Sequence, residues 1–563
     1  MAVLRNKVLF FTTSPRSPQK MIPEIRLLHE KFEGKEWNVN TQKSFIDELV
    51  ESSFFEGKGS PSDKAFSARD RINRAPKSLG FVDLQPFISL TEAGKALVYG
   101  KRPQEIFLRQ LLKYQLPSPY HIENNDISGT FCVRPYLEIL RLVRILEYLT
   151  FDEIKIFALQ LTDYHNFDTI KNMILTFRKE KECYRGKYKK LVDEIWTSNI
   201  KELYADTIAS GKTKTRETTD ASLKKFISTK KSNMRDYTDA CFRYLRYTGL
   251  ISISNKNKSI SIFADKIVEV DFILANVDRN PVFINDSEQY KQHLFSTDNP
   301  ILYTDNKDNI IDIIMKIGSF TKRELSEMKL EQLKDLRNDI IQIHKETVIH
   351  EQITEIKSYA LYSEIIDTFN EIISDGYYDA PLMLEYNTWR AMTMLDGGDI
   401  KGNFKFDDSG QPLSTAQGNM PDIECNYTDY SLSVEVTLQS GQRQYETEGE
   451  PVARHYGQLK KRSGKDTYCL FIAPSINPAV IAHFFILNRT NVSYYGGKSK
   501  IVPLDLDLFM KLIENSYNYR AHPKSSDIHN LLKKIIDKVD SSSNEIEWYD
   551  YIQICANNWL VNK

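Results

Sequence analysis

The spacing of apolar residues divides the chain into regions with different expected structures. Residues 1–120 alternate short helical and extended segments, and residues 121–200 carry apolar side chains at helical spacing, as in PYLEILRLVRILEYL. Residues 270–345 are rich in charge, with Leu and Ile at helical spacing, which predicts two or three helices. Residues 346–563 alternate helical and strand patterns, which predicts an α/β domain.

Two stretches of the N-terminal half predict a helix followed by short extended segments. The first, AFSARDRINRAPKSLGFVDL, precedes a predicted strand, a helix cap at Thr91 and a helix. The second predicts a helix that stops at Gly249 and a hairpin around Asn255–Lys258. Both orders of elements resemble winged-helix DNA-binding units, with SISNKNKSISI as the wing of the second. Arg243 and Arg246 are candidates for DNA contact, whereas Tyr247 is expected in the core.

Two carboxylates fall in a region of predicted strands, Met420–Lys460. Asp422 follows a Pro and opens an extended run, and Glu435 lies in SLSVEVTL, whose alternation predicts a strand. Period-2 geometry places Glu435 and Thr437 on one face of that strand, with the neighbouring valines on the other. TYCLFIAPS, SKIVPLDL and NVSYYGG predict further strands, and DIHNLLKKIIDKVD predicts an amphipathic helix.

A carboxylate on an otherwise apolar strand is costly to bury without a partner, and hard cations are common partners of such groups. Mg²⁺ held by Asp422 and Glu435 would polarise a phosphodiester and supply a hydroxide nucleophile. Two isolated acidic residues at strand ends are also common structural features. The flanking helical patterns add Glu385 upstream, and Glu448 and His455 downstream. Pro451 predicts a helix start close to it, with Glu448 in the loop that enters the helix.

Several strings around these residues resemble one known family. GNMPDIE, EVT, EGEPVARHY and CLFIAPSIN, in that order, are similar to the AlwI family of type IIS restriction endonucleases, which includes nicking enzymes. SPRSP, FSARDR and RYTGL in the N-terminal half resemble the same family. The resemblance implies a PD-(D/E)xK nuclease core and a cognate DNA methyltransferase in the same system. It also implies catalytic roles for Glu385, Asp422, Glu435, Glu448 and His455, with Glu385 as a further metal ligand beside Asp422 and Glu435.

The chain departs from the broader PD-(D/E)xK pattern where the lysine is expected. Thr437 occupies that position, and its hydroxyl cannot act as a cation that orients water. His455, Glu448 or Gln439 would take the role, or the metal would perform most of the activation.

The net charge of −1 conceals a difference between the two parts of the chain. Residues 1–250 contain 42 Lys and Arg against 31 Asp and Glu, and the remainder contains 33 against 45. A basic DNA-reading part joined to a carboxylate-rich catalytic part would have this distribution, although chance imbalance is the alternative. The basic residues that we single out for DNA contact are Arg16, Lys20, Arg69, Arg71, Arg74, Lys77, Lys212, Lys214, Arg216, Lys230, Lys231 and Arg235.

The sequence therefore predicts a multidomain α+β enzyme with four parts. Winged-helix-like recognition subdomains would occupy residues 1–120 and 121–275, a helical linker 276–345, and the nuclease domain 346–563. The predicted activity is that of a type IIS endonuclease, which binds a short sequence in double-stranded DNA and cuts outside it with Mg²⁺. The alternatives are a strand-specific nicking enzyme, acting alone, as a transient dimer or with a small catalytic subunit, and a non-catalytic DNA-binding regulator.

Other classes are disfavoured by what the sequence lacks. GKTKT has no spaced upstream Gly and no preceding apolar strand, so it is not a phosphate-binding loop of an ATP-driven enzyme. No apolar run approaches the length of a membrane span, and the N-terminus does not have the pattern of a signal peptide. The six cysteines are scattered without a CxxC pair. These features predict a cytoplasmic protein with reduced thiols and no membrane partner, and the family resemblance implies a bacterial source.

Overall fold

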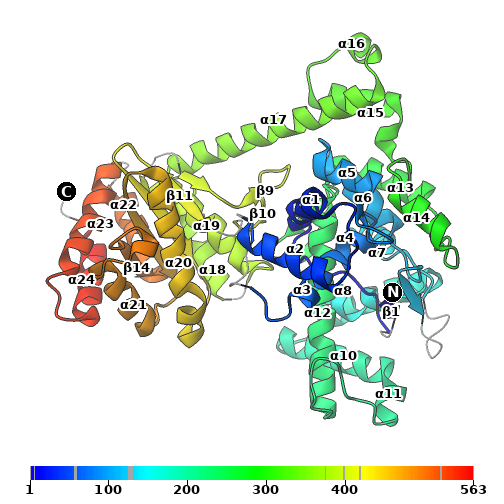
Figure 1. Cartoon of the computed structure of the whole chain (residues 1–563), viewed down its shortest axis with the longest axis horizontal. Coiled ribbons are helices and arrows are strands. Elements are labelled where there is room, and N and C mark those ends of the chain that lie inside the picture. Colours follow the sequence, from blue (N-terminus) through cyan, green and yellow to red (C-terminus); the bar gives the residue numbers. More distant parts are fainter. Residues whose placement is uncertain are drawn as a thin grey trace. The chain divides into compact units, whose positions relative to one another are not determined.

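The computed structural model describes residues 2–4, 7–52, 54–55, 60–123, 131–374, 376–396, 400–416, 420–519 and 523–561. The chain divides into two compact units (Figure 1). Unit 1 comprises Met1–Glu51 and Lys58–Ile340, and unit 2 comprises Ser52–Gly57 and Ile341–Lys563. The finer division into four parts stays a prediction.

Unit 1 is built mainly of helices, as the apolar spacing predicted. The first helices are α1 (Met21–Phe32), α2 (Val39–Glu51), α3 (Lys64–Ile72), α4 (Ala75–Ser78), α5 (Glu92–Tyr99), α6 (Pro103–Lys113), α7 (Pro135–Leu146), α8 (Phe151–Ile156) and α9 (Phe167–Cys183). They are followed by α10 (Tyr188–Leu203), α11 (Ala205–Ala209), α12 (Leu223–Tyr247), α13 (Ile267–Asn276), α14 (Ser287–Phe295), α15 (Lys307–Ile317) and α16 (Lys322–Ser326).

Short strands punctuate these helices where the two wings were expected. β2 (Val82–Asp83) pairs with β3 (Ser89–Leu90), after which the Thr91 hydroxyl accepts the Gly94 N–H at 2.9 Å and caps α5. β6 (Ile251–Ser254) and β7 (Ser259–Ile262) form the predicted hairpin, and β5 (Tyr148–Thr150) pairs with β7. Gly249 ends the helix before this hairpin with a φ of 72°, and Tyr247 is buried as expected. A parallel pair, β1 (Ala2–Leu4) and β4 (His121–Glu123), completes the described strands of this unit.

A long helix, α17 (Leu330–Lys357), begins in unit 1 and ends in unit 2 (Figure 1). Its start is fixed within unit 1 by Lys334, which contacts Asp305 and Glu105. Its later part belongs to unit 2, where the Lys345 ammonium donates to the Phe406 carbonyl at 2.7 Å. Between Lys334 and Lys345 the side chain of Ile343 is 63% exposed, so the middle of the helix is open to solvent.

Unit 2 contains a mixed five-stranded sheet in the order β14-β13-β12-β11-β8. β12, β13 and β14 are parallel, while β11 runs antiparallel to β12 and β8 antiparallel to β11. The protein is thus a mostly helical α+β protein. The strands of the sheet are β8 (Ile400–Gly402), β11 (Ile423–Asn426), β12 (Tyr430–Val436), β13 (Asp466–Ala473) and β14 (Ile501–Asp505). The remaining two described strands of this unit, β9 (Lys405–Phe406) and β10 (Pro412–Ser414), pair with each other. The helices after α17 are α18 (Tyr362–Ile373), α19 (Ala380–Asp396), α20 (Gly441–Ser463), α21 (Pro478–Arg489), α22 (Leu506–Tyr519), α23 (Ser525–Val539) and α24 (Glu545–Asn558).

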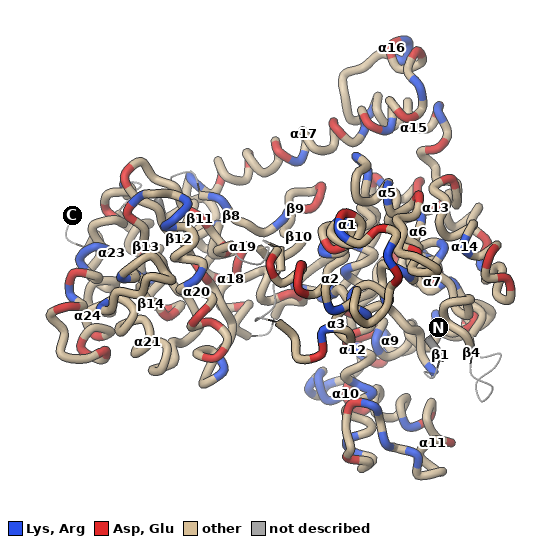
Figure 2. Tube along the Cα trace, viewed as in Figure 1, with Lys and Arg blue, Asp and Glu red and all other residues tan. Residues whose placement is uncertain are grey.

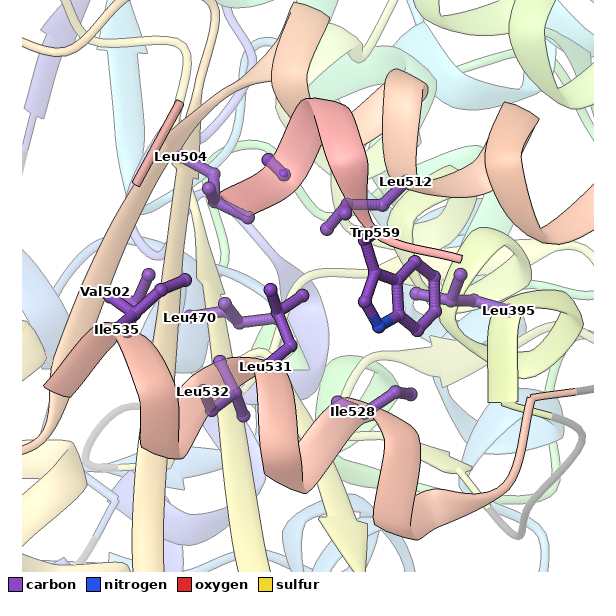
Figure 3. A pocket seen from close by; sticks show the side chains of 11 residues that line it. Leu395, Leu470, Val502, Leu504, Leu512, Ile528, Leu531, Leu532, Ile535 and Trp559 are labelled. Atoms are coloured by element: carbon purple, nitrogen blue, oxygen red, sulfur yellow. The ribbon is translucent and has the colours of Figure 1, made fainter. Parts of the chain in front are cut away.

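The two faces of this sheet bury different sets of side chains. Leu470 and Val502 face the larger core, where residues of α19, α22, α23 and α24 cover the sheet. Phe471 and Ile501, the alternate positions of the same strands, face α20 and α21. A small void remains in the larger core, lined only by apolar side chains such as Leu532, Ile535 and Trp559 (Figure 3). An apolar void of this kind stays dry and is a packing feature, not a polar ligand site.

One strand prediction is wrong. NVSYYGG forms a short 3-10 helix, Ser493–Tyr495, with an isolated bridge between Val492 and Gly497. Gly496 and Gly497 have φ values of 78° and 107°, so the chain turns where a strand would have continued. The strand predicted after it is present as β14, and the predicted amphipathic helix is α23.

Two further observations bear on the class of protein. No disulfide joins any of the six cysteines, all of which lie in the described ranges. Across those same ranges, no helix has both the length and the apolar character needed to cross a membrane.

Candidate active site

The pairing of β11 with β12 brings the two predicted metal ligands together. Ile423 lies opposite Val434 in this antiparallel pair. Continuing the register by one residue places Asp422 opposite Glu435. The Val436 N–H donates to Asp422 Oδ2 at 2.8 Å, which fixes the carboxylate against the end of β12. Local strand geometry therefore accounts for the convergence of two residues thirteen positions apart.

The faces of β12 are as predicted. Val434 is buried in the larger core, and Val436 packs against the same core. Glu435 and Thr437 instead meet α20, where Thr437 Oγ1 donates to Glu448 Oε1 at 3.2 Å. The polar face of β12 thus lies under a helix that itself carries polar side chains.

The helix α20 also supplies His455, seven residues after Glu448. One imidazole nitrogen, Nδ1, lies 3.0 Å from Glu435 Oε1. Burial lowers the pKa of His455 to about 4, so the ring is neutral at pH 7. A neutral imidazole can place an N–H against Glu435 and leave its other nitrogen for water or substrate.

The prediction that the helix starts near Pro451 is wrong, because α20 begins ten residues earlier, at Gly441. The first turns are held by Gln444, whose side chain is completely buried. Its amide NH₂ donates to the carbonyls of Gln439 and Ser475, both at 2.9 Å, and its carbonyl oxygen accepts the Asn477 N–H at 2.7 Å. These contacts stabilise helix upstream of the proline, so Glu448 lies within the helix. Sequence reasoning missed Gln444, since its partners come from distant segments and no local pattern marks them.

Glu385 enters the site from α19 and is buried. The Ala416 N–H donates to Glu385 Oε2 at 3.0 Å. Burial raises the pKa of Glu385 well above its ordinary value, and the nearby charge of Asp422 raises it further. The effect of Asp422 on Glu385 shows that the third predicted carboxylate lies in the same negatively charged region.

The same causes act on the central pair. Burial raises the pKa of Asp422 well above its ordinary value, and the charge of Glu435 adds to the effect. Burial raises the pKa of Glu435 likewise, with Glu448 as the next contribution. Carboxylates that repel one another in a region of low exposure favour a bound cation, because the cation neutralises both.

These residues fit a magnesium ion held by few protein ligands. Within the described part of the chain, no three His, Cys, Asp or Glu side chains are arranged to hold a metal ion together. Mg²⁺ in phosphoryl-transfer sites is usually bound by one or two carboxylates, with water and phosphate oxygens as its other ligands. Asp422 and Glu435 would serve as those two carboxylates, and Glu385 would act through water.

The basic residues that we singled out in the N-terminal segment, residues 16–77, mostly make intramolecular contacts. Four of them lie on or near α3 and α4, and each is paired with another side chain of unit 1. The pairs are Arg69 with Gln42, Arg71 with Glu24, Arg74 with Asp70, and Lys77 with the ring of Tyr120. Arg16 is exposed, although its Nε lies 2.9 Å from Asp239, and Lys20 is half-buried at the end of a 3-10 helix.

The second basic segment, residues 211–235, divides into two groups. Lys230 lies over the rings of Tyr204 and Phe226, and Lys231 contacts Asp193 and lies over Trp196. These two ammonium groups pack against the protein. The other four basic residues that we singled out in this segment lie in the loop after α11 and on α12 (Figure 2), and all four are exposed. They are Lys212, Lys214, Arg216 and Arg235.

Comparison with known proteins identifies the class. Residues 77–512 match the family described as AlwI restriction endonuclease. The protein is therefore a restriction endonuclease, an enzyme that hydrolyses phosphodiester bonds of DNA. The chain belongs to the AlwI restriction endonuclease family, which confirms the resemblance seen in the sequence.

Two similar solved structures are restriction enzymes. The small subunit of the heterodimeric restriction endonuclease R.BspD6I is 27% identical, with a TM-score of 0.30, over 34% of this chain and 98% of its own. The restriction endonuclease FokI is 12% identical, with a TM-score of 0.24, over 93% of this chain and 98% of its own. No curated protein sequence matches the chain.

Proposed function

We propose that the protein is a type IIS endonuclease that binds a short sequence in double-stranded DNA and hydrolyses a phosphodiester bond at a fixed distance outside it with Mg²⁺. The observation that carries the proposal is the convergence of Asp422, Glu435, Glu448 and His455 at the meeting of β11, β12 and α20. The predicted recognition subdomains, residues 1–120 and 121–275, would bind DNA. Residues 276–345 would link them to the catalytic domain, residues 346–563.

The residues of the candidate active site would have different roles in the reaction. Asp422 and Glu435 would hold the cation through carboxylate oxygens, and Glu385 would orient a water beside it. Mg²⁺, when bound, supplies positive charge to the reacting phosphate and lowers the pKa of water. Glu448 takes the place of the missing lysine, because its carboxylate lies against Thr437 and can accept a proton from water. His455 donates an N–H to Glu435, and its second nitrogen, an acceptor in the neutral ring, accepts a hydrogen bond from water.

A strand-specific nicking enzyme is the second candidate. One set of catalytic carboxylates hydrolyses one strand at a time, so cleavage of both strands requires a second copy, a partner subunit or reorientation. The family match favours an enzyme over a non-catalytic regulator. A methyltransferase that protects the same DNA sequence would be the functional partner in the host.

Cleavage of supercoiled plasmid in Mg²⁺ or EDTA, followed by sequencing of the ends, tests the proposal. The wild-type protein should give discrete ends at a fixed distance from one short motif, only in Mg²⁺. Asp422→Ala should be inactive, while Asp429→Ala should cut normally, because Asp429 is an exposed residue between the same two strands. Open circles alone would support the nicking alternative. Intact plasmid that still binds the protein would contradict the catalytic assignment.

A further inference from the structure

The contact between α20 and the sheet continues beyond the catalytic residues. Glu448, His455 and Arg462 are spaced seven residues apart, so they lie along one side of α20. The first two contact Thr437 and Glu435. Arg462 contacts Glu424 of β11, with 2.7 Å between Nη2 and Oε2. Like the first two, this third contact joins a side chain of α20 to a side chain on or next to strands β11 and β12. The mechanism proposed above gives it no role.

Glu424 lies on the catalytic face of the sheet. It is two residues after Asp422, and it pairs with Ser433, which is two residues before Glu435. Its side chain is 7% exposed, whereas that of Arg462 is 54% exposed. A buried carboxylate needs charge-assisted hydrogen bonds to offset the loss of water, and Arg462 provides one.

The second partner of Glu424 connects it to the backbone that carries Asp422. Asn403, which follows β8, donates its side-chain NH₂ to Glu424 Oε1 at 3.1 Å and to the Pro421 carbonyl at 2.7 Å. Its backbone N–H donates to the Asp422 carbonyl at 2.9 Å. A continuous set of hydrogen bonds therefore runs from Arg462 of α20 through Glu424 and Asn403 to the backbone of Pro421 and Asp422.

We propose that Arg462, Glu424 and Asn403 form a positioning network that holds the Asp422 carboxylate in register with Glu435 and so sets the affinity of the site for its divalent cation. This inference rests on the proposed function. Metal sites require their ligands to be held within about 0.5 Å by surrounding hydrogen bonds. None of the three residues touches the reacting atoms, so each acts through Asp422.

The test compares Arg462→Met with a matched control, Glu364→Gln. Arg390 and Glu364 form a similar pair in unit 2, at 2.8 Å, with one buried and one exposed partner. Both changes remove the exposed partner and leave a buried charge unpaired, so both should lower stability. A network that positions Asp422 predicts that Arg462→Met alone changes metal binding and cleavage.

Two measurements separate positioning from stability. The first is the Mn²⁺ affinity of the DNA-free protein, measured from the loss of free Mn²⁺ signal in electron paramagnetic resonance. The second is the single-turnover cleavage rate at increasing Mg²⁺, with protein in excess over DNA and corrected for the folded fraction. Arg462→Met and Glu424→Gln should weaken Mn²⁺ binding about 10–100-fold and raise the half-saturating Mg²⁺ similarly. Arg462→Lys should recover most of the loss, and Asn403→Ala should resemble Glu424→Gln.

Each outcome decides the proposal. Variants that lose stability but keep wild-type Mn²⁺ affinity and Mg²⁺ dependence, like Glu364→Gln, would overturn it and leave the network purely structural. A wild-type protein that cuts no DNA would defeat the proposed function alone. The Mn²⁺ titration would still test the network in that case, because it requires no cleavage.

Discussion

The carboxylates that we propose as cation ligands, at the ends of β11 and β12, also oppose folding. The pKa of Asp422 is raised by burial and by the charge of Glu435, so its ionised form is unfavourable in the folded protein without a cation. The hydrogen bond from Val436 offsets only part of this cost. The site is therefore a place where removal of a functional group should stabilise the fold.

Asp422→Asn should abolish cleavage and raise the free energy of unfolding in EDTA by about 1–2 kcal/mol. The amide oxygen still accepts the Val436 N–H, while the repulsion with Glu435 disappears. Urea denaturation at pH 7 in EDTA measures the change, with Asp429→Asn as the exposed control. A less stable variant would show that the repulsion does not dominate.

Glu448→Gln tests which residue replaces the missing lysine. The amide keeps the contact with Thr437 but cannot accept a proton, so single-turnover cleavage should fall about 100-fold or more. DNA affinity in Ca²⁺ should remain close to that of the wild type. Glu446→Gln, an exposed change on the same helix, serves as the control. A cleavage rate close to the wild-type value for Glu448→Gln would transfer the role to His455.

The convergence of Asp422 and Glu435, both proposed as catalytic, was predictable in part because strand positions follow local periodicity. Strand alternation placed Glu435 opposite the valine face, whereas Glu448 was expected in a loop and lies within α20, on the same side as His455. Gln444 and Asn403 were not predictable, since each bonds to segments remote in sequence. Three of the basic residues proposed for DNA contact on α3 and α4 have partners that the sequence does not reveal, such as Glu24 for Arg71.

At the scale of elements, tertiary contacts decide where helices begin and end. A proline in a helical pattern usually marks a helix start, yet the buried Gln444 holds α20 together upstream of Pro451. The paired glycines after Tyr495 turn the chain where β-branched and aromatic residues predicted a strand. The start of α17 depends on a comparable buried network, in which Arg109 and Lys334 both contact Asp305 and Glu105.

Arg109→Met should lower the free energy of unfolding at pH 7 by about 2–3 kcal/mol, because it leaves two half-buried carboxylates with Lys334 as their remaining close partner. Burial alone would raise the pKa of Glu105, but the positive charges of Lys334 and Arg109 outweigh burial and lower it. The pKa of Asp305 is lowered in the same way. The stabilisation from these lowered pKa values is present above the unfolded pKa of about 4 and is lost as pH falls through the folded values.

The difference in the free energy of unfolding between Arg109→Met and the wild type should therefore become smaller as the pH falls from about 5 to about 3. Urea denaturation across this range measures it. Arg144→Met removes a more exposed pair with Asp271 and should cost at most about 1 kcal/mol at any pH. A difference that stays constant with pH would show that Arg109 acts through packing instead of charge.

The exposed middle of α17 allows a test of whether the helical linker sets the distance between the recognition sequence and the cleaved bond. Inserting seven helix-forming residues after Ile343 adds nearly two turns and about 10 Å, close to three base pairs of DNA. Cleavage should persist at a displaced position. Inserting two residues rotates the following helix by about 200° and should scatter or abolish cleavage. Ile343→Gln is the control, and unchanged ends in all three variants would exclude a spacer role.

At the scale of the whole molecule, charge is divided unevenly along the chain, and the basic excess lies in residues 1–250. Exposed basic residues in the loop after α11 give this part a surface suited to phosphates. Changing Lys212, Lys214 and Arg216 to Gln should weaken DNA binding and reduce the slope of log affinity against log salt by about 2–3. The cleavage rate of the bound complex should not change. An unaltered slope would place the phosphate contacts elsewhere.

The positions of Asp422, Glu424, Glu435, Glu448, His455 and Arg462 have an evolutionary consequence. All six lie in one short stretch, residues 422–462, and their contacts with one another are made within it. Recombination between related genes can exchange the sequence that encodes unit 1 without breaking those contacts. Because unit 1 carries the proposed recognition subdomains, lineages that descend from such exchanges would acquire new target sequences while inheriting one unaltered chemistry.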